Sequence, residues 1–192
     1  MQNTSNILYT DRTKVINMKS ELLCREAEDD FFYFNNVNAA YRKLKKAVEL
    51  TPFHTKSVLL FADVCFVKGL IKDALELYSR IEKISPLNTK VLASIANCNY
   101  VLGNYSLSLQ YIDKVMELLN DESISLQSQL LEIKINILMF ERNYKQAYVT
   151  FIQAQNVLDS HSLKTIYNVS YEVLEEKINL QKKLRKSNLK IV

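Results

Sequence analysis

The side chains best suited to acid–base, nucleophilic or metal chemistry are few and widely spaced in this 192-residue chain. Its two histidines, His54 and His161, lie 107 residues apart. A catalytic base must reach its partner within hydrogen-bond distance, and a zinc site needs several His or Cys ligands close together. The spacing of the two histidines therefore predicts neither a shared metal site nor a catalytic pair.

The cysteines and glycines narrow the chemistry further. Cys24, Cys65 and Cys98 are odd in number and form no CxxC pair, so we expect small buried thiols in a reducing compartment. The chain has only two glycines and contains no HExxH or GxSxG motif, which leaves nothing from which to build a phosphate-binding loop. We therefore expect a protein that is not an enzyme and that binds no cofactor and no metal.

Charge and hydropathy indicate a location but no polyanionic partner. The formal net charge of +4 is mild. The longest apolar runs, such as 58–61 and 64–67, are far shorter than a bilayer requires, so we expect no transmembrane segment. The first residues lack the basic start and long apolar stretch of a secretory signal. We expect a cytoplasmic protein.

The helix-breaking residues recur at one interval. Gly103 follows Gly69 by 34 residues, and Pro86 follows Pro52 by the same 34. Glycine costs a helix interior about 1 kcal/mol and proline about 3 kcal/mol, so both types belong at helix ends. A shared interval at two kinds of breaker predicts an internal repeat.

A 34-residue frame with the prolines at position 32 brings like residues into register. Position 20 is small in each repeat, and positions 24 and 27 are mostly bulky and apolar. The residues at position 20 are Ala40, Ala74, Ser108 and, after a five-residue shift, Ala147. This pattern resembles the tetratricopeptide repeat (TPR), which has small residues at positions 8 and 20, a bulky residue at 24 and Pro at 32. The resemblance implies an all-α, right-handed α-solenoid of about four TPR helical hairpins with a C-terminal capping helix.

The frame gives a domain map. We expect a loose N-terminus at 1–10, with the first helix capped by Thr10 or Asp11, a TPR domain at 11–187 and a loose tail at 188–192. The expected repeats are 21–54, 55–88, 89–122 and 128–161, followed by a capping helix at 162–187. The helix pairs are expected at 11–34 with 38–50, 55–68 with 71–84, 89–102 with 105–119, and 124–141 with 144–158.

The resemblance also implies a binding groove. In TPR arrays the first (A) helix of each repeat lines a concave face, and two columns of this face stand out here. Position 9 forms an acid-to-amide row, and amides offer both a donor and an acceptor. Positions 12 and 13 form an apolar, aromatic edge that could anchor apolar side chains. The candidate peptide-binding residues are Arg25, Asp29, Phe32, Tyr33, Asp63, Phe66, Asn97, Tyr100, Asn136 and Phe140.

Two other interpretations of the groove remain open. These side chains could pack between neighbouring A helices, or the chain's own terminus could fill the groove. The family's clamp for a C-terminal carboxylate is not supported. Among the positions that form this clamp, only Arg25 and Lys90 carry a suitable charge, and Asp29 would repel a carboxylate.

The leading functional interpretation is a protein-interaction module that binds a peptide or partner protein as an adaptor, assembly factor or chaperone-like subunit. The alternative is a nucleic-acid- or membrane-associated protein that uses the basic C-terminal helix from Lys177 onwards. The 34-residue interval and the acidic start of the groove make a nucleic-acid partner the weaker expectation. A second basic cluster is expected on the convex side of 38–50, and the sequence indicates no oligomeric state. That cluster comprises Arg42, Lys43, Lys45 and Lys46.

Overall fold

The computed structural model describes residues 2–119, 123–157, 175–180 and 183, and within these ranges every regular element is a helix. Residues 175–180 form a short helical stretch near the C-terminus. The longer helices are α1 (Gln2–Phe32), α2 (Val37–Leu50), α3 (Thr55–Val67), α4 (Ile71–Ile84), α5 (Thr89–Val101), α6 (Tyr105–Leu118), α7 (Ile124–Phe140) and α8 (Tyr144–Val157). From α2 to α8, every end lies within one residue of its expected position.

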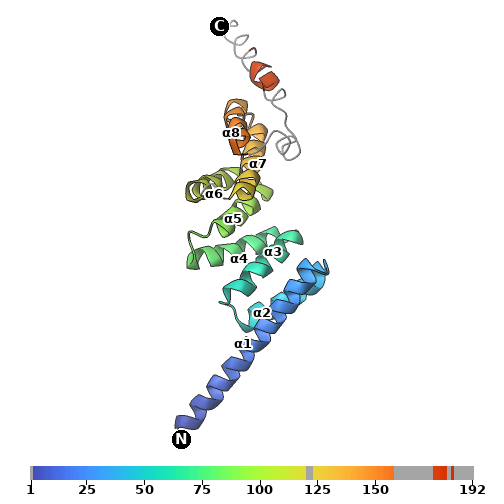
Figure 1. The fold of residues 1–192 in the computed structure, drawn as a ribbon, viewed down its shortest axis with the longest axis vertical. Coiled ribbons are helices and arrows are strands. Elements are labelled where there is room, and N and C mark those ends of the chain that lie inside the picture. Colours follow the sequence, from blue (N-terminus) through green and yellow to red (C-terminus); the bar gives the residue numbers. More distant parts are fainter. Residues whose placement is uncertain (1, 120–122, 158–174, 181–182, 184–192) are drawn as a thin grey trace. The chain divides into compact units, whose positions relative to one another are not determined.

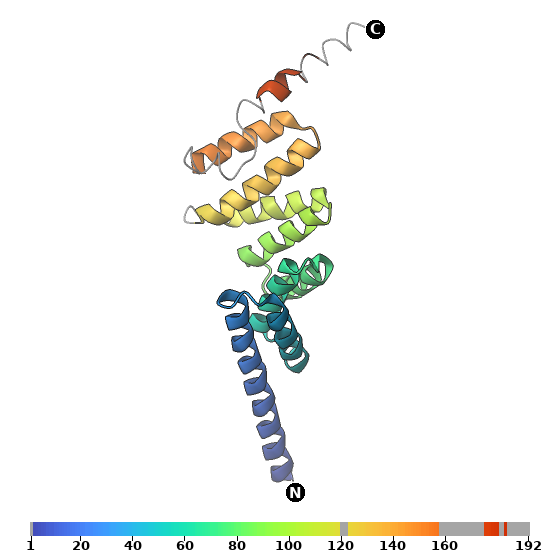
Figure 2. The ribbon, with the colours of Figure 1, turned by 90° about the vertical axis from the view of Figure 1, so that its right-hand side faces the viewer.

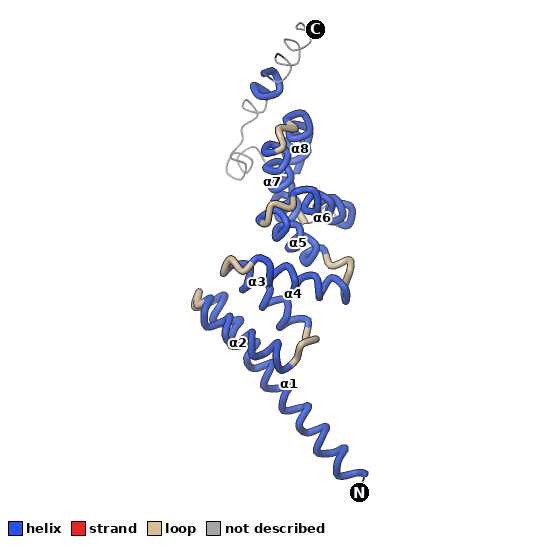
Figure 3. The backbone as a smooth tube through the Cα atoms, turned by 180° about the vertical axis from the view of Figure 1, so that it is seen from behind, coloured by secondary structure: helices blue, strands red, loops and turns tan. Residues whose placement is uncertain are grey.

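The chain divides into two compact units, Met1–Leu102 and Gly103–Val192. In unit 1, α1 pairs with α2 and α3 pairs with α4 as antiparallel hairpins, α2 packs on α3, and α5 packs on α4 (Figure 1). In unit 2, α7 and α8 form a hairpin, and α6 contacts α7 (Figure 3). The described chain is thus an all-α fold of helices packed in neighbouring pairs.

The hairpin turns share one backbone feature. Position 15 of the four windows is Asn35, Gly69, Gly103 and Arg142, and each of these residues has a positive φ, of 49°, 77°, 78° and 59° respectively. This left-handed conformation ends a helix, and glycine adopts it without steric cost. Glycine therefore stands at two of the four turns because the turn requires its backbone freedom.

Small residues lie where the two helices of a hairpin cross. Ala40, Ala74 and Ala147 are fully buried, and so is Ser108 on α6. Around Ala40 the core contains Cys24, Ala27 and Leu44 of the first hairpin together with Leu60 and Val64 of α3. Around Ala147 the core of the last hairpin contains Leu131, Ile135, Leu138, Phe151 and Ala154. Small side chains at these points let the helix axes approach closely, as the position-20 column predicts.

The first helix differs from the expectation. It begins at Gln2 rather than near Asp11, so residues 2–10 are helical and not a loose N-terminus. The reason is local: no glycine or proline interrupts this stretch, and extending an existing helix costs far less than starting one. Residues 11–19 are all exposed, and this part of α1 extends beyond α2 (Figure 2).

Several sequence expectations concern the C-terminal part of the chain. His161, most of the expected capping helix at 162–187 and the tail at 188–192 lie outside the described residues. The short helical stretch 175–180 brings the Lys177 ammonium over the Tyr144 ring, 5.6 Å from its centroid. Within the described part of the chain, no helix combines the length and the apolar character needed to cross a bilayer.

Candidate functional site

The described histidine lies next to the first turn of a helix, and the three cysteines lie in the helical core. His54 is the residue that precedes α3, and its Nδ1 lies 2.7 Å from Ser57 Oγ in the first turn of that helix. Cys24, Cys65 and Cys98 are free and buried. Burial raises the pKa of the Cys65 thiol to about 11 and that of Cys98 to about 12, so both stay protonated at neutral pH. Among the described residues no cluster of His, Cys, Asp and Glu could hold a metal ion.

Eight of the ten predicted groove residues lie in unit 1, on or directly after the A helices α1, α3 and α5. We call this surface the A-helix face. It comprises Arg25, Asp29 and Phe32 on α1, Tyr33 just beyond its end, Asp63, Phe66 and Val67 on α3, and Asn97, Tyr100 and Val101 on α5. The remaining two candidates, Asn136 and Phe140, lie on α7 in unit 2. The candidates thus lie on three A helices of unit 1 and on one helix of unit 2.

The position-9 row is not uniform. Asp29 is exposed, whereas Asp63 is half-buried and accepts a 2.6 Å hydrogen bond from the Tyr78 hydroxyl on α4. Burial raises the pKa of Asp63, and the hydrogen bond from Tyr78 partly opposes that rise. Tyr78 is itself buried, and its pKa is raised first by burial and then by its bond to Asp63. Asp63 thus ties α3 to α4, while Asp29 faces solvent.

The apolar edge is also divided. Phe66 and Tyr100 at position 12 are half-buried, which matches the alternative of packing between neighbouring helices. The next residues, Val67 and Val101 at position 13, expose 58% and 52% of their surface, and Phe32 on α1 exposes 62%. The sequence pattern places both valines in the apolar edge at position 13, but only the aromatic residues of this edge were kept as binding candidates in the second and third repeats. The available signal was that each valine is the last residue of its helix, where the next turn no longer covers the side chain.

Polar contacts connect the A helices to their neighbours. Lys56 Nζ on α3 lies 2.7 Å from Glu28 Oε2 on α1. Glu28 occupies position 8, where the repeat pattern expects a small residue, and its carboxylate raises the pKa of Lys56. The departure from the pattern thus provides an ion pair between the first two A helices.

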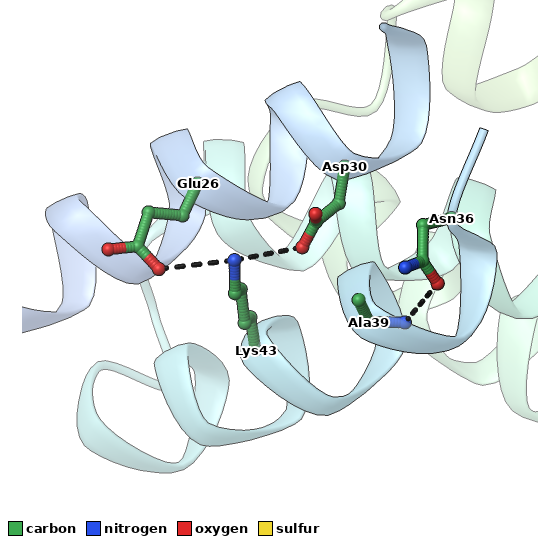
Figure 4. A network of polar contacts seen from close by, with 5 residues as sticks. All are labelled: Glu26, Asp30, Asn36, Ala39 and Lys43. Atoms are coloured by element: carbon green, nitrogen blue, oxygen red, sulfur yellow. Dashed lines mark hydrogen bonds and ion pairs between the residues drawn. The ribbon is translucent and has the colours of Figure 1, made fainter. Parts of the chain in front are cut away.

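A second set of contacts holds the first hairpin together (Figure 4). Lys43 Nζ on α2 lies 2.9 Å from Asp30 Oδ2 and 3.2 Å from Glu26 Oε2, both on α1. The Asn36 side chain caps α2 by accepting a 3.1 Å bond from the Ala39 amide. Lys43 therefore points toward α1, and the expected convex basic cluster is reduced to the exposed Arg42, Lys45 and Lys46.

In unit 2, the α7 surface mixes one exposed aromatic with partly buried polar groups. Phe140 is largely exposed, and its ring packs edge-on against Tyr105 of α6 with centroids 5.0 Å apart. Asn136 is half-buried, and burial raises the pKa of Glu132 one turn earlier.

Comparison with known proteins supports the fold. No protein-family model matches the chain, and no curated protein matches it. Among solved structures, the chain is similar to TTC0263, a thermophilic TPR protein of Thermus thermophilus. The TM-score is 0.58 at 13% sequence identity, over 77% of this chain and 78% of that one. Identity this low carries the fold alone, so the described chain has a TPR-like helical-hairpin fold.

Proposed function

We propose that the chain is a non-enzymatic protein-interaction module that binds a peptide or helical segment of a partner protein on its A-helix face. In the cell it would serve as an adaptor, an assembly factor or a chaperone-like subunit. The observation that carries the proposal is the exposure of Phe32, Val67 and Val101 at the ends of α1, α3 and α5.

Physical chemistry supports this use of the surface. Apolar side chains that stay exposed at equivalent places of successive helices are the kind of surface that marks an interaction site. The polar row beside them supplies Asp29, whose carboxylate is exposed, and Asn97, whose amide can both donate and accept. A bound segment could thus anchor apolar side chains at the helix ends and satisfy its own polar groups along the row.

The fold supports the same conclusion at a coarser level. Stacked helical hairpins present extended surfaces built from equivalent positions, and such surfaces suit partner proteins better than small substrates. The described residues include no cluster that could hold a metal ion, and the two thiols whose pKa is raised are protonated and buried. An interaction scaffold therefore accounts for the molecule without invoking catalysis.

The test replaces the two exposed valines with Val67→Lys and Val101→Lys. A cation at the last residue of a helix interacts favourably with the helix dipole, so the double variant should fold like the parent. We expect it to lose binding to the partner by at least about tenfold, equivalent to about 1.4 kcal/mol. Partners captured from cell extract would be identified by mass spectrometry, and the dissociation constant of the purified partner would then be measured.

The matched control places the same substitution on the B helices of unit 2, at Leu107 and Val149. Both are exposed apolar residues of similar accessibility, on α6 and α8. Their lysine variants should retain the partner. Equal loss in both double variants, or retention in both, would contradict binding on the A-helix face. Circular dichroism melting of each variant separates a binding defect from an unfolded protein.

A further inference from the structure

A pocket lies on unit 1 beside the turn between α2 and α3. This site, the turn pocket, has a volume of about 250 Å³, and its walls come from the turn, the start of α3 and the end of α4. Its lining residues are Pro52, Phe53, Thr55, Val58, Arg80, Ile81, Lys83 and Ile84. None of them belongs to the A-helix face.

The apolar wall of the turn pocket includes side chains that folding has left uncovered. Phe53 exposes 85% of its surface, although it follows a proline in a tight turn, and Ile84 exposes 59%. Val58 and Ile81 form the buried part of the wall. An aromatic ring held at the rim of an apolar depression suits the capture of another apolar side chain.

The charge of the turn pocket has one sign. Arg80 and Lys83 are the charged residues of its lining as described. The start of α3 adds to them, because the first backbone N–H groups of a helix are unpaired and carry partial positive charge. In α3 the first intrahelical bond runs from the Val58 amide to the His54 carbonyl, so the amide of Thr55, a lining residue, precedes it. Both features favour an anionic group next to the apolar wall.

The size of the pocket limits the class of ligand. Pockets for whole small molecules typically measure roughly 300–1,000 Å³. The turn pocket is smaller than that range and open at the rim, where Phe53 stands, so it fits one or two side chains of a longer chain. A peptide that inserts a bulky apolar residue and carries acidic residues beside it matches both the volume and the charge.

We propose that the turn pocket is a second binding site on this protein, specific for an acidic peptide segment of a partner protein with a bulky apolar anchor residue. The anchor enters against Phe53, Val58 and Ile84, and the acidic groups of the peptide face Arg80 and Lys83. This proposal is independent of the A-helix face, because the two surfaces share no residue.

A neighbouring depression indicates on which side of Phe53 the acidic residues of the peptide would lie. It measures about 370 Å³ and also uses Phe53, but its other walls include Glu21, His54 and the polar side chains Asn17, Ser20 and Thr51. Glu21 would repel an acidic residue placed there. The acidic flank of the peptide is therefore expected on the α4 side of Phe53, and a neutral or basic flank on the α1 side.

The experiment selects ligands from a random peptide library displayed on phage, using the full chain as bait. Enriched peptides are expected to carry a bulky apolar residue within a few positions of Asp or Glu. A fluorescein-labelled synthetic copy of the enriched sequence is then titrated by fluorescence polarisation. Phe53→Ser and Lys83→Glu should each weaken its binding by about tenfold, and added salt should weaken it further. Arg80 is left intact, because its Nη2 donates a 2.7 Å bond to the Pro52 carbonyl and so supports the turn.

Matched control variants make the same kinds of substitution at residues outside the turn pocket. Leu87→Ser removes an exposed apolar residue at the turn of the next repeat, and Lys45→Glu reverses an exposed cation on α2; neither residue lines the pocket. Both controls should keep the dissociation constant within about twofold. The proposal is overturned if no acidic consensus is enriched, or if Phe53→Ser and Lys83→Glu bind like the parent. Loss of the peptide only in Val67→Lys/Val101→Lys would also overturn it while leaving the A-helix face supported.

Discussion

The first two hairpins of unit 1 follow the same repeat frame but fasten their helices by different polar contacts. In the α1–α2 hairpin, Lys43 bridges the carboxylates of Glu26 and Asp30 at the partly exposed edge of the helix pair. In the α3–α4 hairpin, the buried Tyr78 donates to the half-buried Asp63. Removing the acceptor of a buried hydroxyl is costly, whereas an ion pair whose side chains remain partly exposed contributes less.

The difference determines which acidic groups remain for a ligand. Asp29 and Asp63 occupy the same repeat position, yet only Asp29 is exposed. Asp63 is half-buried and already accepts a hydrogen bond from the Tyr78 hydroxyl. A column of like residues in a repeat alignment is therefore not a column of equivalent binding groups. In unit 1 the polar row exposes a carboxylate at its α1 end, and at α3 its carboxylate joins α3 to α4.

The largest expected effect comes from removing the buried fastening. Asp63→Ala leaves the Tyr78 hydroxyl proton without its acceptor, and we expect a loss of about 1–3 kcal/mol in the free energy of unfolding. Asp29→Ala, at the equivalent exposed place, should stay within about 0.5 kcal/mol. Urea titrations of both variants measure the contrast. In the double variant Asp63→Ala/Tyr78→Phe the losses should be less than additive, and strict additivity would show that the two side chains do not interact.

The next largest expected effect on stability comes from replacing the turn glycine of the second hairpin. Gly69 has a φ of 77°, and a Cβ added there would meet no atom within 4 Å, so the cost of Gly69→Ala is that of the backbone conformation alone. We expect a loss of about 1 kcal/mol in the free energy of unfolding. The first hairpin has Asn35 at this position with a φ of 49°, and Asn35→Gly should stabilise by a few tenths of that amount. Thermal melting of the two variants should show shifts of opposite sign, and shifts of the same sign would refute this account of the turns.

The surface fastening of the first hairpin should matter less. Lys43→Met keeps most of the aliphatic stem and removes the charge that meets Glu26 and the buried Oδ2 of Asp30, so we expect a loss of about 1 kcal/mol. The loss should shrink at high salt, because screening weakens the ion pairs in the parent. Urea titrations at low and high salt check this. A loss as large as that of Asp63→Ala would remove the distinction between the two hairpins.

The smallest effect is the pH dependence of stability that Asp63 contributes in the second hairpin. Burial raises the folded-state pKa of Asp63 above its ordinary value of 3.8, so the folded chain holds this proton to higher pH than the unfolded chain does. The stability that the proton contributes is complete below pH 3.8 and is lost as the pH rises through the raised pKa. Asp63→Asn retains an acceptor for Tyr78 and should flatten this slope. Parallel pH profiles of parent and variant in urea titrations would contradict the assignment.

The sequence predicted the helix ends well because backbone rules act locally. Gly69 and Gly103 have the positive φ that only glycine adopts freely, and the frame also placed Asn35 and Arg142 at positions with this conformation. The predicted start of α1 was wrong, because a stretch without glycine or proline permits a helix but does not mark where the helix begins. Local rules thus determined the ends of the hairpin helices and not the length of the first one.

The candidate site was harder to predict because exposure depends on neighbours distant in sequence. The spacing of repeats placed Asp63 on the A-helix face, but it could not reveal that Tyr78 bonds to it from the next helix. Lys43 was expected to face solvent on the convex side, yet two carboxylates of α1 attract it. Val67 and Val101 were placed in the apolar edge but not among the binding candidates, because residue type was weighed above position at a helix end.

The central claim is that the A-helix face of unit 1 contacts the partner, and photo-crosslinking in cells tests it most directly. A photoreactive amino acid at position 67, on the A-helix face, is compared with the same amino acid at position 42, an exposed position of α2. The account predicts a discrete crosslinked product from position 67 that Val101→Lys diminishes, and none from position 42. Crosslinks from position 42 alone, or equal products from both positions, would contradict binding on the A-helix face.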